Sequence, residues 1–113
     1  IDWVLHPSLE NNKYHALARK YLPDGQGGML SFGVKGNVKD AAKFMEALRL
    51  VTQETHVADT RSCVLHPAST THRQLSKEEL AAAGVPENLI RLSVGIENPD
   101  DIIEDLKQAL QKI

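Results

Sequence analysis

The sequence predicts an α+β fold, a two-layer domain in which a mostly antiparallel sheet carries helices on one face. Two stretches, 29–35 and 90–96, alternate apolar and polar residues as half-buried strands do. Two others, 37–51 and 98–113, repeat apolar residues at helical spacing. The full order, β-α-β-α-β-β-α-β-α, allows amphipathic helices to cover the apolar face of one sheet.

The composition suits a single folded domain spanning residues 1–113, with 42% apolar and 25% charged residues. Thirteen Lys and Arg against fifteen Asp and Glu give a net charge of −2, whereas a nucleic-acid binder usually has a basic surplus. No apolar run approaches the roughly 20 residues that span a bilayer, and no signal peptide opens the chain. The single cysteine, Cys63, excludes an internal disulfide. We therefore expect a cytoplasmic protein without nucleic-acid or membrane partners.

The first half of the chain is expected to form two strands and two helices. Residues 2–5 are a short strand that His6-Pro7 ends, because the residue before proline avoids the helical region. Residues 9–22 place apolar side chains on one helical face, and the turn sequence after them ends that helix. In 29–35, Leu30, Phe32 and Val34 share one side of a strand. Asn37 is a suitable N-cap for a helix that runs to about Val51.

The second half is expected to supply three strands and two helices. Two short extended segments are predicted at His56–Ala58 and Ser62–His66. Ser76 and Glu79 form a capping box that starts a short helix, which ends at Gly84. In 90–96, the apolar face holds Ile90, Leu92, Val94 and Ile96. The last helix begins after Asn98 with Pro99 in its first turn.

The face of the sheet opposite the core is expected to be polar and to meet a ligand or another domain. It would carry Ser31, Lys35, Arg91 and Ser93. Arg91, in the middle of its strand, has a guanidinium suited to bidentate carboxylate binding. An ordinary surface salt bridge is the commoner role for such a residue, and spacing alone leaves both roles open.

Other candidate constellations favour structural roles. The histidines have no metal-site spacing, so we expect loop and strand-end hydrogen bonds from His6, His15, His56, His66 and His72. Cys63 and His66 lie three residues apart on a strand and point to opposite faces, which favours a buried thiol over a nucleophile. The glycines at 25–28 precede a strand, whereas a phosphate loop opens a helix, so a turn is expected.

Two long motifs resemble one family. The stretch from Val64 through the His66-Pro67-Ala68-Ser69-Thr70-Thr71-His72 segment, and Ile90-Arg91-Leu92-Ser93-Val94-Gly95-Ile96-Glu97, are similar to the C-terminal domain of the Cys/Met-metabolism pyridoxal-phosphate enzymes. Lys20 to Pro23, Gly25 to Gly28 and Leu30 to Gly36 resemble the same cystathionine γ-synthase-like family. The His-Pro loop with two threonines is most similar to the O-acetylhomoserine sulfhydrylase branch. The resemblance covers essentially the whole chain.

The resemblance implies the small C-terminal domain of aminotransferase fold type I. It implies that the complete enzyme uses pyridoxal 5'-phosphate to convert O-acetyl-L-homoserine and sulfide to homocysteine and acetate, and that Arg91 binds the α-carboxylate of the amino-acid substrate. It also implies a large domain of the same enzyme and a homo-oligomer, a tetramer in the family. The family's lysine motif is missing from all eight lysines, so we expect a piece of a longer protein that binds no cofactor covalently and is inactive alone.

One segment departs from the family pattern. Before the His-Pro loop the family has Ser or Asn, an apolar residue and Gly near the substrate, whereas the corresponding residues here are His56, Val57 and Ala58. His56 is therefore a second candidate for substrate binding. A cystathionine γ-synthase or γ-lyase is the alternative within the family. A non-catalytic ligand-binding or assembly module is the alternative from another class.

Overall fold

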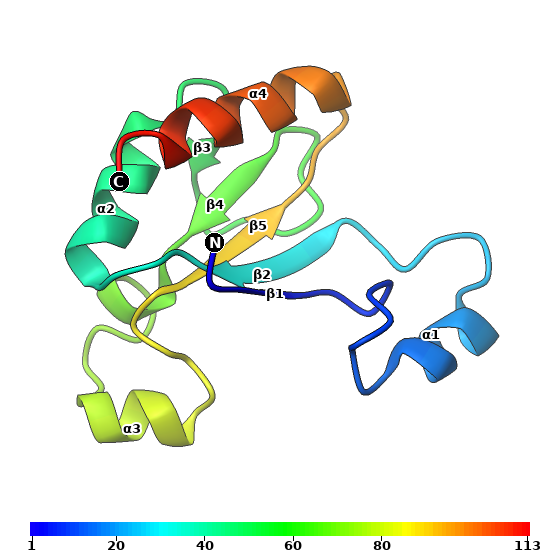
Figure 1. The fold of residues 1–113 in the computed structure, drawn as a ribbon, viewed down its shortest axis with the longest axis horizontal. Helices are drawn as coiled ribbons and strands as arrows, with labels where there is room; N and C mark the ends of the chain where they lie inside the picture. Colours follow the sequence, from blue (N-terminus) through cyan, green and yellow to red (C-terminus); the bar gives the residue numbers. More distant parts are fainter.

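The computed structural model describes residues 1–113, and its elements follow the predicted order (Figure 1). The strands are β1 (Trp3–Leu5), β2 (Met29–Gly33), β3 (Thr52–Gln53), β4 (Cys63–Leu65) and β5 (Leu89–Ser93). The helices are α1 (His15–Tyr21), α2 (Val38–Ala47), α3 (Lys77–Ala82) and α4 (Pro99–Leu110), with one 3-10 turn, η1 (Pro67–Ser69). No helix has both the length and the hydrophobicity that crossing a membrane requires.

The five strands form one sheet in the order β1-β2-β5-β4-β3. Three of the four strand pairs are antiparallel, and only β3 and β4 run parallel, which confirms the mostly antiparallel prediction. The strand β5, nearly last in the sequence, lies at the centre of the sheet between β2 and β4. Arg91 is therefore held on a strand that is hydrogen-bonded on both sides.

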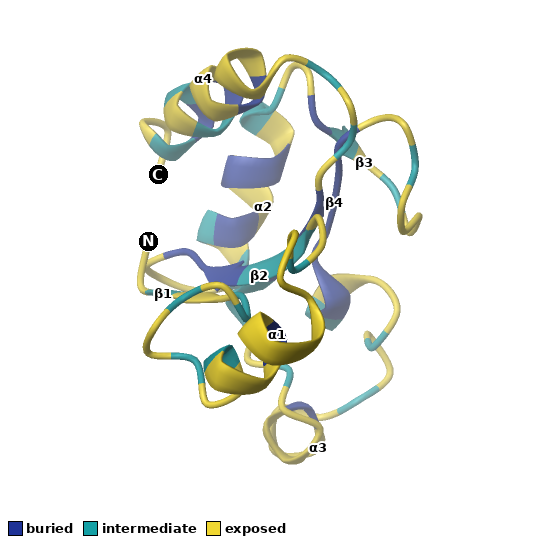
Figure 2. Ribbon diagram, turned by 90° about the vertical axis from the view of Figure 1, so that its right-hand side faces the viewer, coloured by how far each residue is buried: buried dark blue, intermediate teal, exposed yellow.

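The core lies between one face of the sheet and the helices α2 and α4, which cover that face (Figure 2). Leu92 pairs with Leu30 and Val64, and Ile90 pairs with Phe32, so apolar side chains from three strands form continuous rows. The ring of Phe32 meets that of Phe44 from α2 edge-on, with centroids 5.8 Å apart. The helices α1 and α3 lie outside this layer, each with one buried residue.

Side-chain caps fix the starts of three helices as the sequence predicts. The hydroxyl of Ser76 accepts the backbone N–H of Glu79, and the Glu79 carboxylate accepts that of Ser76. Asn98 caps α4 by accepting the N–H of Asp100, with Pro99 in the first turn. Asn37 caps α2.

The first helix is shorter than the predicted 9–22, because the residues before His15 form a series of turns instead. The amide oxygen of Asn12 accepts the N–H of Tyr14 at 2.9 Å, a local bond that competes with helical hydrogen bonding. The predicted apolar face also stays largely uncovered: Ala18 is buried, but Leu17 and Tyr21 are exposed.

The second helix ends at Ala47, not near Val51, for an electrostatic reason. The carboxylate of Asp105 from α4 accepts the backbone N–H groups of Arg49, Leu50 and Val51 at 2.8–2.9 Å. These groups are satisfied by a side chain distant in sequence, so they do not continue the helix.

Two strand predictions need correction. His56–Ala58 forms no strand, since Val57 and Ala58 are a bend, and the strand in this region is β3, at Thr52–Gln53. The central strand ends at Ser93, so Ile96 is not on the apolar face and is 83% exposed. After Ser93 the backbone N–H groups bond to three different segments, at Gly28, Ser62 and Thr60, which ends regular pairing.

Candidate functional site

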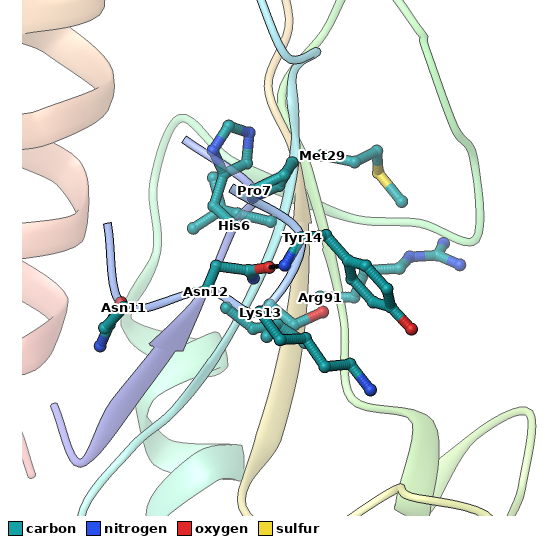
Figure 3. Close-up of a pocket in the computed structure, with 11 residues that line it drawn as sticks. His6, Pro7, Asn11, Asn12, Lys13, Tyr14, Met29 and Arg91 are labelled. Carbon is teal, nitrogen blue, oxygen red and sulfur yellow. Dashed lines mark hydrogen bonds between the residues drawn. The ribbon is translucent and has the colours of Figure 1, made fainter. Parts of the chain in front are cut away.

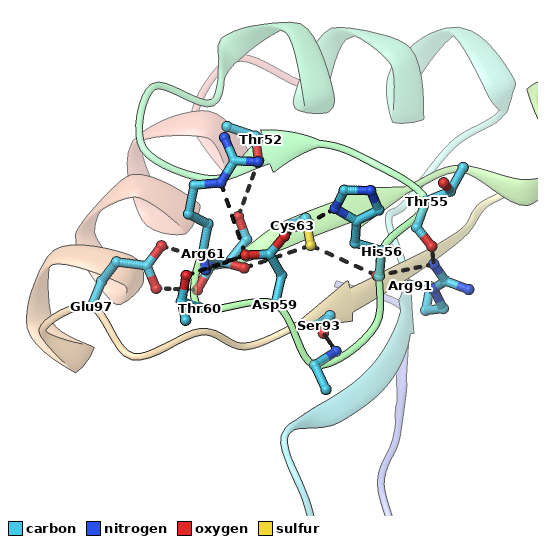
Figure 4. A network of polar contacts seen from close by, with 12 residues as sticks. Thr52, Thr55, His56, Asp59, Thr60, Arg61, Cys63, Arg91, Ser93 and Glu97 are labelled. Carbon is cyan, nitrogen blue, oxygen red and sulfur yellow. Dashed lines mark hydrogen bonds and ion pairs between the residues drawn. The ribbon is translucent and has the colours of Figure 1, made fainter.

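Arg91 projects from the face of the sheet opposite the core and has no acidic partner. Its cross-strand neighbours are Ser31 on β2 and Leu65 on β4. One guanidinium nitrogen, Nη2, donates to the carbonyl oxygens of Thr55 at 2.8 Å and His56 at 3.4 Å (Figure 4). None of the four ion pairs in the structure involves Arg91. The ordinary salt bridge that the sequence left open is therefore not formed.

Arg91 lines the largest hollow in the structure, of about 770 Å³ (Figure 3). The hollow is bounded by the segment 5–7, the segment 11–14, the start of β2 and Arg91. Its lining includes two cationic side chains, Arg91 and Lys13, and no Asp or Glu. Such a lining favours a small anion, and a guanidinium with unoccupied N–H groups can bind a carboxylate in two parallel hydrogen bonds.

The wall of the hollow nearest the N-terminus is held by two histidines, His6 and His15, for which the sequence predicts only hydrogen bonds. His6 lies 2.7 Å from the Ser8 hydroxyl through Nδ1 and 3.1 Å from the Gly27 carbonyl through Nε2. His15 Nδ1 lies 3.0 Å from the carbonyl of Pro7. The glycine-rich turn is confirmed by the φ of +89° at Gly27. The turns of 6–14 fold this segment beside β2, a placement for which the sequence carries no periodic signal.

The loop that supplies the two acceptors for Arg91 also contains His56. The His56 ring is exposed, and its Nδ1 lies 2.9 Å from the carboxylate of Asp59 (Figure 4). Hydrogen bonds, first from the backbone N–H of Arg61 and then from His56, lower the pKa of Asp59 to about 2. The contact of His56 with Arg91 is thus made by its backbone carbonyl, while its side chain binds Asp59.

Ala58, where the family has Gly, adopts a left-handed conformation with φ of +58°. It is the only residue other than glycine with a positive φ. Its N–H donates to the hydroxyl of Ser93, which is buried on β5 two residues after Arg91. The loop is therefore anchored to the central strand on both sides of His56.

A second anchor joins the end of the same loop to the segment after β5. The Glu97 carboxylate accepts the backbone N–H of Ser62 at 2.6 Å and its hydroxyl at 2.9 Å. These hydrogen bonds lower the pKa of Glu97. Gly95 donates its N–H to the Ser62 hydroxyl, and a Cβ at Gly95 would overlap the backbone of Thr60 and Arg61. The end of the second motif, Gly95 to Glu97, thus holds the loop that contains His56 in place.

Cys63 and His66 have separate, structural surroundings. Burial raises the pKa of the Cys63 thiol, with smaller contributions from Asp59 and Glu54, which favours an unreactive thiol. His66 is 1% exposed, and its ring nitrogens lie 2.8 Å from the Ser69 hydroxyl and 2.7 Å from the Glu87 carbonyl. The Cys63 thiol lies near the carbonyls of His56 and Arg61, so Cys63 and His66 contact different groups. No group of three or more His, Cys, Asp or Glu is placed to hold a metal ion.

Comparisons with known proteins agree on one family. The family described as Cys/Met metabolism PLP-dependent enzyme matches residues 1–111. The chain is 49% identical over 111 residues to homocysteine synthase of Schizosaccharomyces pombe, and 44% identical over 110 residues to O-acetyl-L-homoserine sulfhydrylase 1 of Thermus thermophilus. These alignments cover 98% and 97% of this chain, and 26% of each relative. The chain spans about a quarter of the length of these relatives.

A solved structure has the same fold. The O-acetylhomoserine (thiol)-lyase structure of Campylobacter jejuni superposes with a TM-score of 0.87 at 44% identity, covering 96% of this chain and 26% of that one. That protein carries a pyridoxyl-phosphate-modified lysine. The fold, the two motifs and these relatives agree, and the chain belongs to the family of Cys/Met metabolism PLP-dependent enzymes.

Proposed function

We propose that this chain is the C-terminal, substrate-closing domain of an O-acetyl-L-homoserine sulfhydrylase, which forms homocysteine and acetate from O-acetyl-L-homoserine and sulfide. The observation that carries the proposal is Arg91, an unpaired arginine at a cationic hollow. Relatives named homocysteine synthase and O-acetyl-L-homoserine sulfhydrylase support the reaction class.

Arg91 is proposed to bind the α-carboxylate of the substrate. Nη2 is held by the carbonyls of Thr55 and His56, which fixes the plane of the guanidinium before substrate arrives. The N–H groups that make no bond to the protein then offer a preset pair of donors. We assign His56 a substrate-binding role through this carbonyl, and its ring binds the Asp59 carboxylate at the edge of the loop.

The residues of this chain do not form a site for pyridoxal phosphate. The glycine-rich turn precedes β2 instead of opening a helix, so it presents no helix N-terminus to a phosphate. Lys77 pairs with Glu87 at 3.3 Å, and Lys13 lies over the Tyr14 ring. The cofactor, which supplies an electron sink when bound, is therefore assigned to the large domain of the enzyme. We expect the isolated chain to bind none covalently and to be inactive.

The same large domain and further copies of the enzyme are the proposed protein partners. Tyr14, Leu17 and Tyr21 of the first helical region are each more than half exposed. A contiguous apolar surface of this kind typically marks an interface. A homo-oligomer, a tetramer in the family, would provide a cover for it.

The test uses the full-length enzyme loaded with pyridoxal phosphate. Homocysteine formation from O-acetyl-L-homoserine and sulfide supports the proposal. Preferential cleavage of methionine would instead assign a γ-lyase, since the L-methionine gamma-lyase of Fusobacterium nucleatum is 42% identical to this chain. Cystathionine formation with cysteine as the sulfur donor would assign a γ-synthase. A protein that binds amino acids without turning them over would assign the non-catalytic module.

A further inference from the structure

The loop that holds the Arg91 side chain is itself held by the segment that follows β5. This loop, residues 54–62, joins β3 to β4 and supplies both carbonyls that accept from Nη2 of Arg91. We name it the Arg91-binding loop. Three hydrogen-bonded pairs, at 2.6–3.1 Å, join it to residues 93–97: Ala58 with Ser93, Thr60 with Ile96, and Ser62 with Glu97. The two segments therefore lie together along much of the length of the loop.

Glu97 binds the end of the Arg91-binding loop through both oxygens of its carboxylate. Oε1 accepts the backbone N–H of Ser62 at 2.6 Å, and Oε2 accepts the Ser62 hydroxyl at 2.9 Å. The Gly95 N–H donates to the same hydroxyl oxygen at 2.9 Å, which directs the hydroxyl proton toward Glu97. Ser62 has no exposed surface, so its polar groups depend on partners within the protein. Hydrogen bonds to an ionised acceptor are stronger than neutral ones, and Glu97 is the one charged group bound to Ser62.

A continuous series of hydrogen bonds leads from the end of the loop back to Arg91 (Figure 4). The N–H of Arg61, next to Ser62 in the chain, donates to one oxygen of the Asp59 carboxylate at 3.1 Å. The other oxygen lies 2.9 Å from Nδ1 of His56. The His56 carbonyl accepts from Nη2 of Arg91 at 3.4 Å. A displacement of Ser62 would therefore be transmitted to the acceptors that orient the guanidinium.

The orientation of the guanidinium matters because a carboxylate binds it through two parallel hydrogen bonds in one plane. The Arg91 side chain is partly exposed, and no ion pair restrains it. Its hydrogen bonds to the Thr55 and His56 carbonyls are the restraints on that plane. Without them, the side chain would have to be ordered when the ligand binds, and this loss of freedom weakens binding.

We propose that Glu97 is a positioning residue for substrate binding: by holding Ser62 it keeps the Arg91-binding loop in place, and the loop orients the Arg91 guanidinium toward the substrate carboxylate. Neither Glu97 nor Ser62 lines the hollow that contains Arg91, so Glu97 acts through Arg91 and not by contact with the substrate. The inference rests on the carboxylate-binding role of Arg91 in the proposed function.

The test is a double-mutant cycle in the full-length enzyme loaded with pyridoxal phosphate. The ligand is L-norleucine, which has the α-carboxylate and α-amino group of the substrate but no acetyl ester to lose. Calorimetry measures its dissociation constant for the unsubstituted enzyme, Glu97→Ala, Arg91→Ala and the double variant. Glu97→Ala should raise this constant about three- to tenfold, and less than about twofold where residue 91 is already alanine. An equal rise in both backgrounds, or no rise in either, overturns the inference.

Two further variants control for folding and for loss of a charge. Glu104→Ala removes an exposed carboxylate from α4 and should leave the dissociation constant unchanged. Glu97→Gln serves where Glu97→Ala does not fold, because its amide oxygen still accepts the Ser62 N–H. It should raise the constant about two- to threefold only when Arg91 is present. A lower thermal midpoint with an unchanged dissociation constant would assign Glu97 a purely structural role and overturn the inference.

The same measurements separate this inference from the proposed function. Homocysteine formation from O-acetyl-L-homoserine and sulfide is assayed on the unsubstituted enzyme. The expected cycle without that activity rejects only the proposed reaction. Weaker norleucine binding by Arg91→Ala, with no effect of Glu97→Ala, rejects only the positioning role. An unchanged dissociation constant for Arg91→Ala rejects the carboxylate site, and the positioning role with it.

Discussion

The N–H of Ala58 donates to the Oγ of Ser93 across 3.1 Å, which ties the one left-handed alanine of the chain to the strand that carries Arg91. The φ of +58° at Ala58 is sterically unfavourable for any residue with a Cβ. The geometry of the loop beside Arg91 is thus maintained at the expense of local backbone strain.

Ala58→Gly should relieve that strain. Removing the Cβ at a positive φ should raise the free energy of unfolding by about 0.5–1 kcal/mol, despite the greater freedom of glycine in the unfolded chain. Urea denaturation of the full-length protein measures the change. Ala42→Gly, at an exposed position within α2, is the control and should lower it by about 1 kcal/mol. Equal destabilisation by both variants would show that position 58 is unstrained.

Arg91→Ala should weaken substrate binding and leave the fold intact. Hydrogen bonds to charged groups contribute about 1.5–3 kcal/mol, so kcat/KM for O-acetyl-L-homoserine should fall roughly ten- to a hundred-fold or more. Arg91→Lys keeps the positive charge but loses the planar guanidinium with its two parallel donors, so it should also weaken substrate binding. Arg73→Ala, at an exposed position, serves as the control. A lower thermal midpoint with unchanged kinetics would assign Arg91 a purely structural role.

His56→Ala should have a smaller effect than Arg91→Ala. The acceptor that His56 offers to Arg91 is a backbone carbonyl, which every substitution retains. We therefore expect a loss in kcat/KM of less than about tenfold, because only the ring contact with Asp59 disappears. Steady-state kinetics of both variants, measured in parallel, provide the comparison. A loss as large as that of Arg91→Ala would indicate that the imidazole itself contacts the substrate.

Asp105→Asn should destabilise the protein in a pH-dependent manner. Burial raises the pKa of Asp105. Hydrogen bonds from the backbone N–H groups of Val51, Arg49 and Leu50 lower it by more, so the pKa of the folded protein lies below the ordinary value of 3.8. A group with a lowered folded pKa contributes stability above its unfolded pKa and loses it as the pH falls through the folded value.

At neutral pH the substitution should cost about 1.5–3 kcal/mol, because an amide cannot accept all three backbone N–H groups with the strength of a carboxylate. The difference from the unsubstituted protein should narrow below about pH 4 as the carboxylate is protonated. Urea denaturation at pH 7 and at pH 3 measures it, with the exposed Glu104→Gln as control. A difference independent of pH would exclude the charge of Asp105 as the cause.

The predictable parts of the fold and site are those that local patterns encode. Alternation placed Leu30, Phe32 and Ile90 on the core face and Arg91 on the opposite one, and the register confirms this arrangement. The capping box at Ser76 was predicted because both partners lie within one helical turn. The unpredicted features depend on residues far apart in sequence: Asp105 ends α2 from more than fifty residues away.

The exposed apolar residues show a second limit of sequence patterns. Leu17 and Tyr21 have the spacing of an apolar helical face, but nothing in these 113 residues buries them. A periodic pattern indicates that an apolar helix face packs against another surface. It does not indicate whether that surface belongs to the same segment of the chain. The same limit applies to Arg91: strand alternation predicted which face of the sheet it occupies, but not whether it forms an ion pair within this chain.

The central position of β5 sets the order of events during synthesis on the ribosome. Until Leu89–Ser93 has emerged, β2 and β4 have no common neighbour, and each exposes an unpaired edge. The sheet of this domain can therefore assemble only after about four fifths of its residues have been translated. A nascent chain stalled before residue 89 would offer those edges to other chains, and unpaired strand edges of this kind promote aggregation.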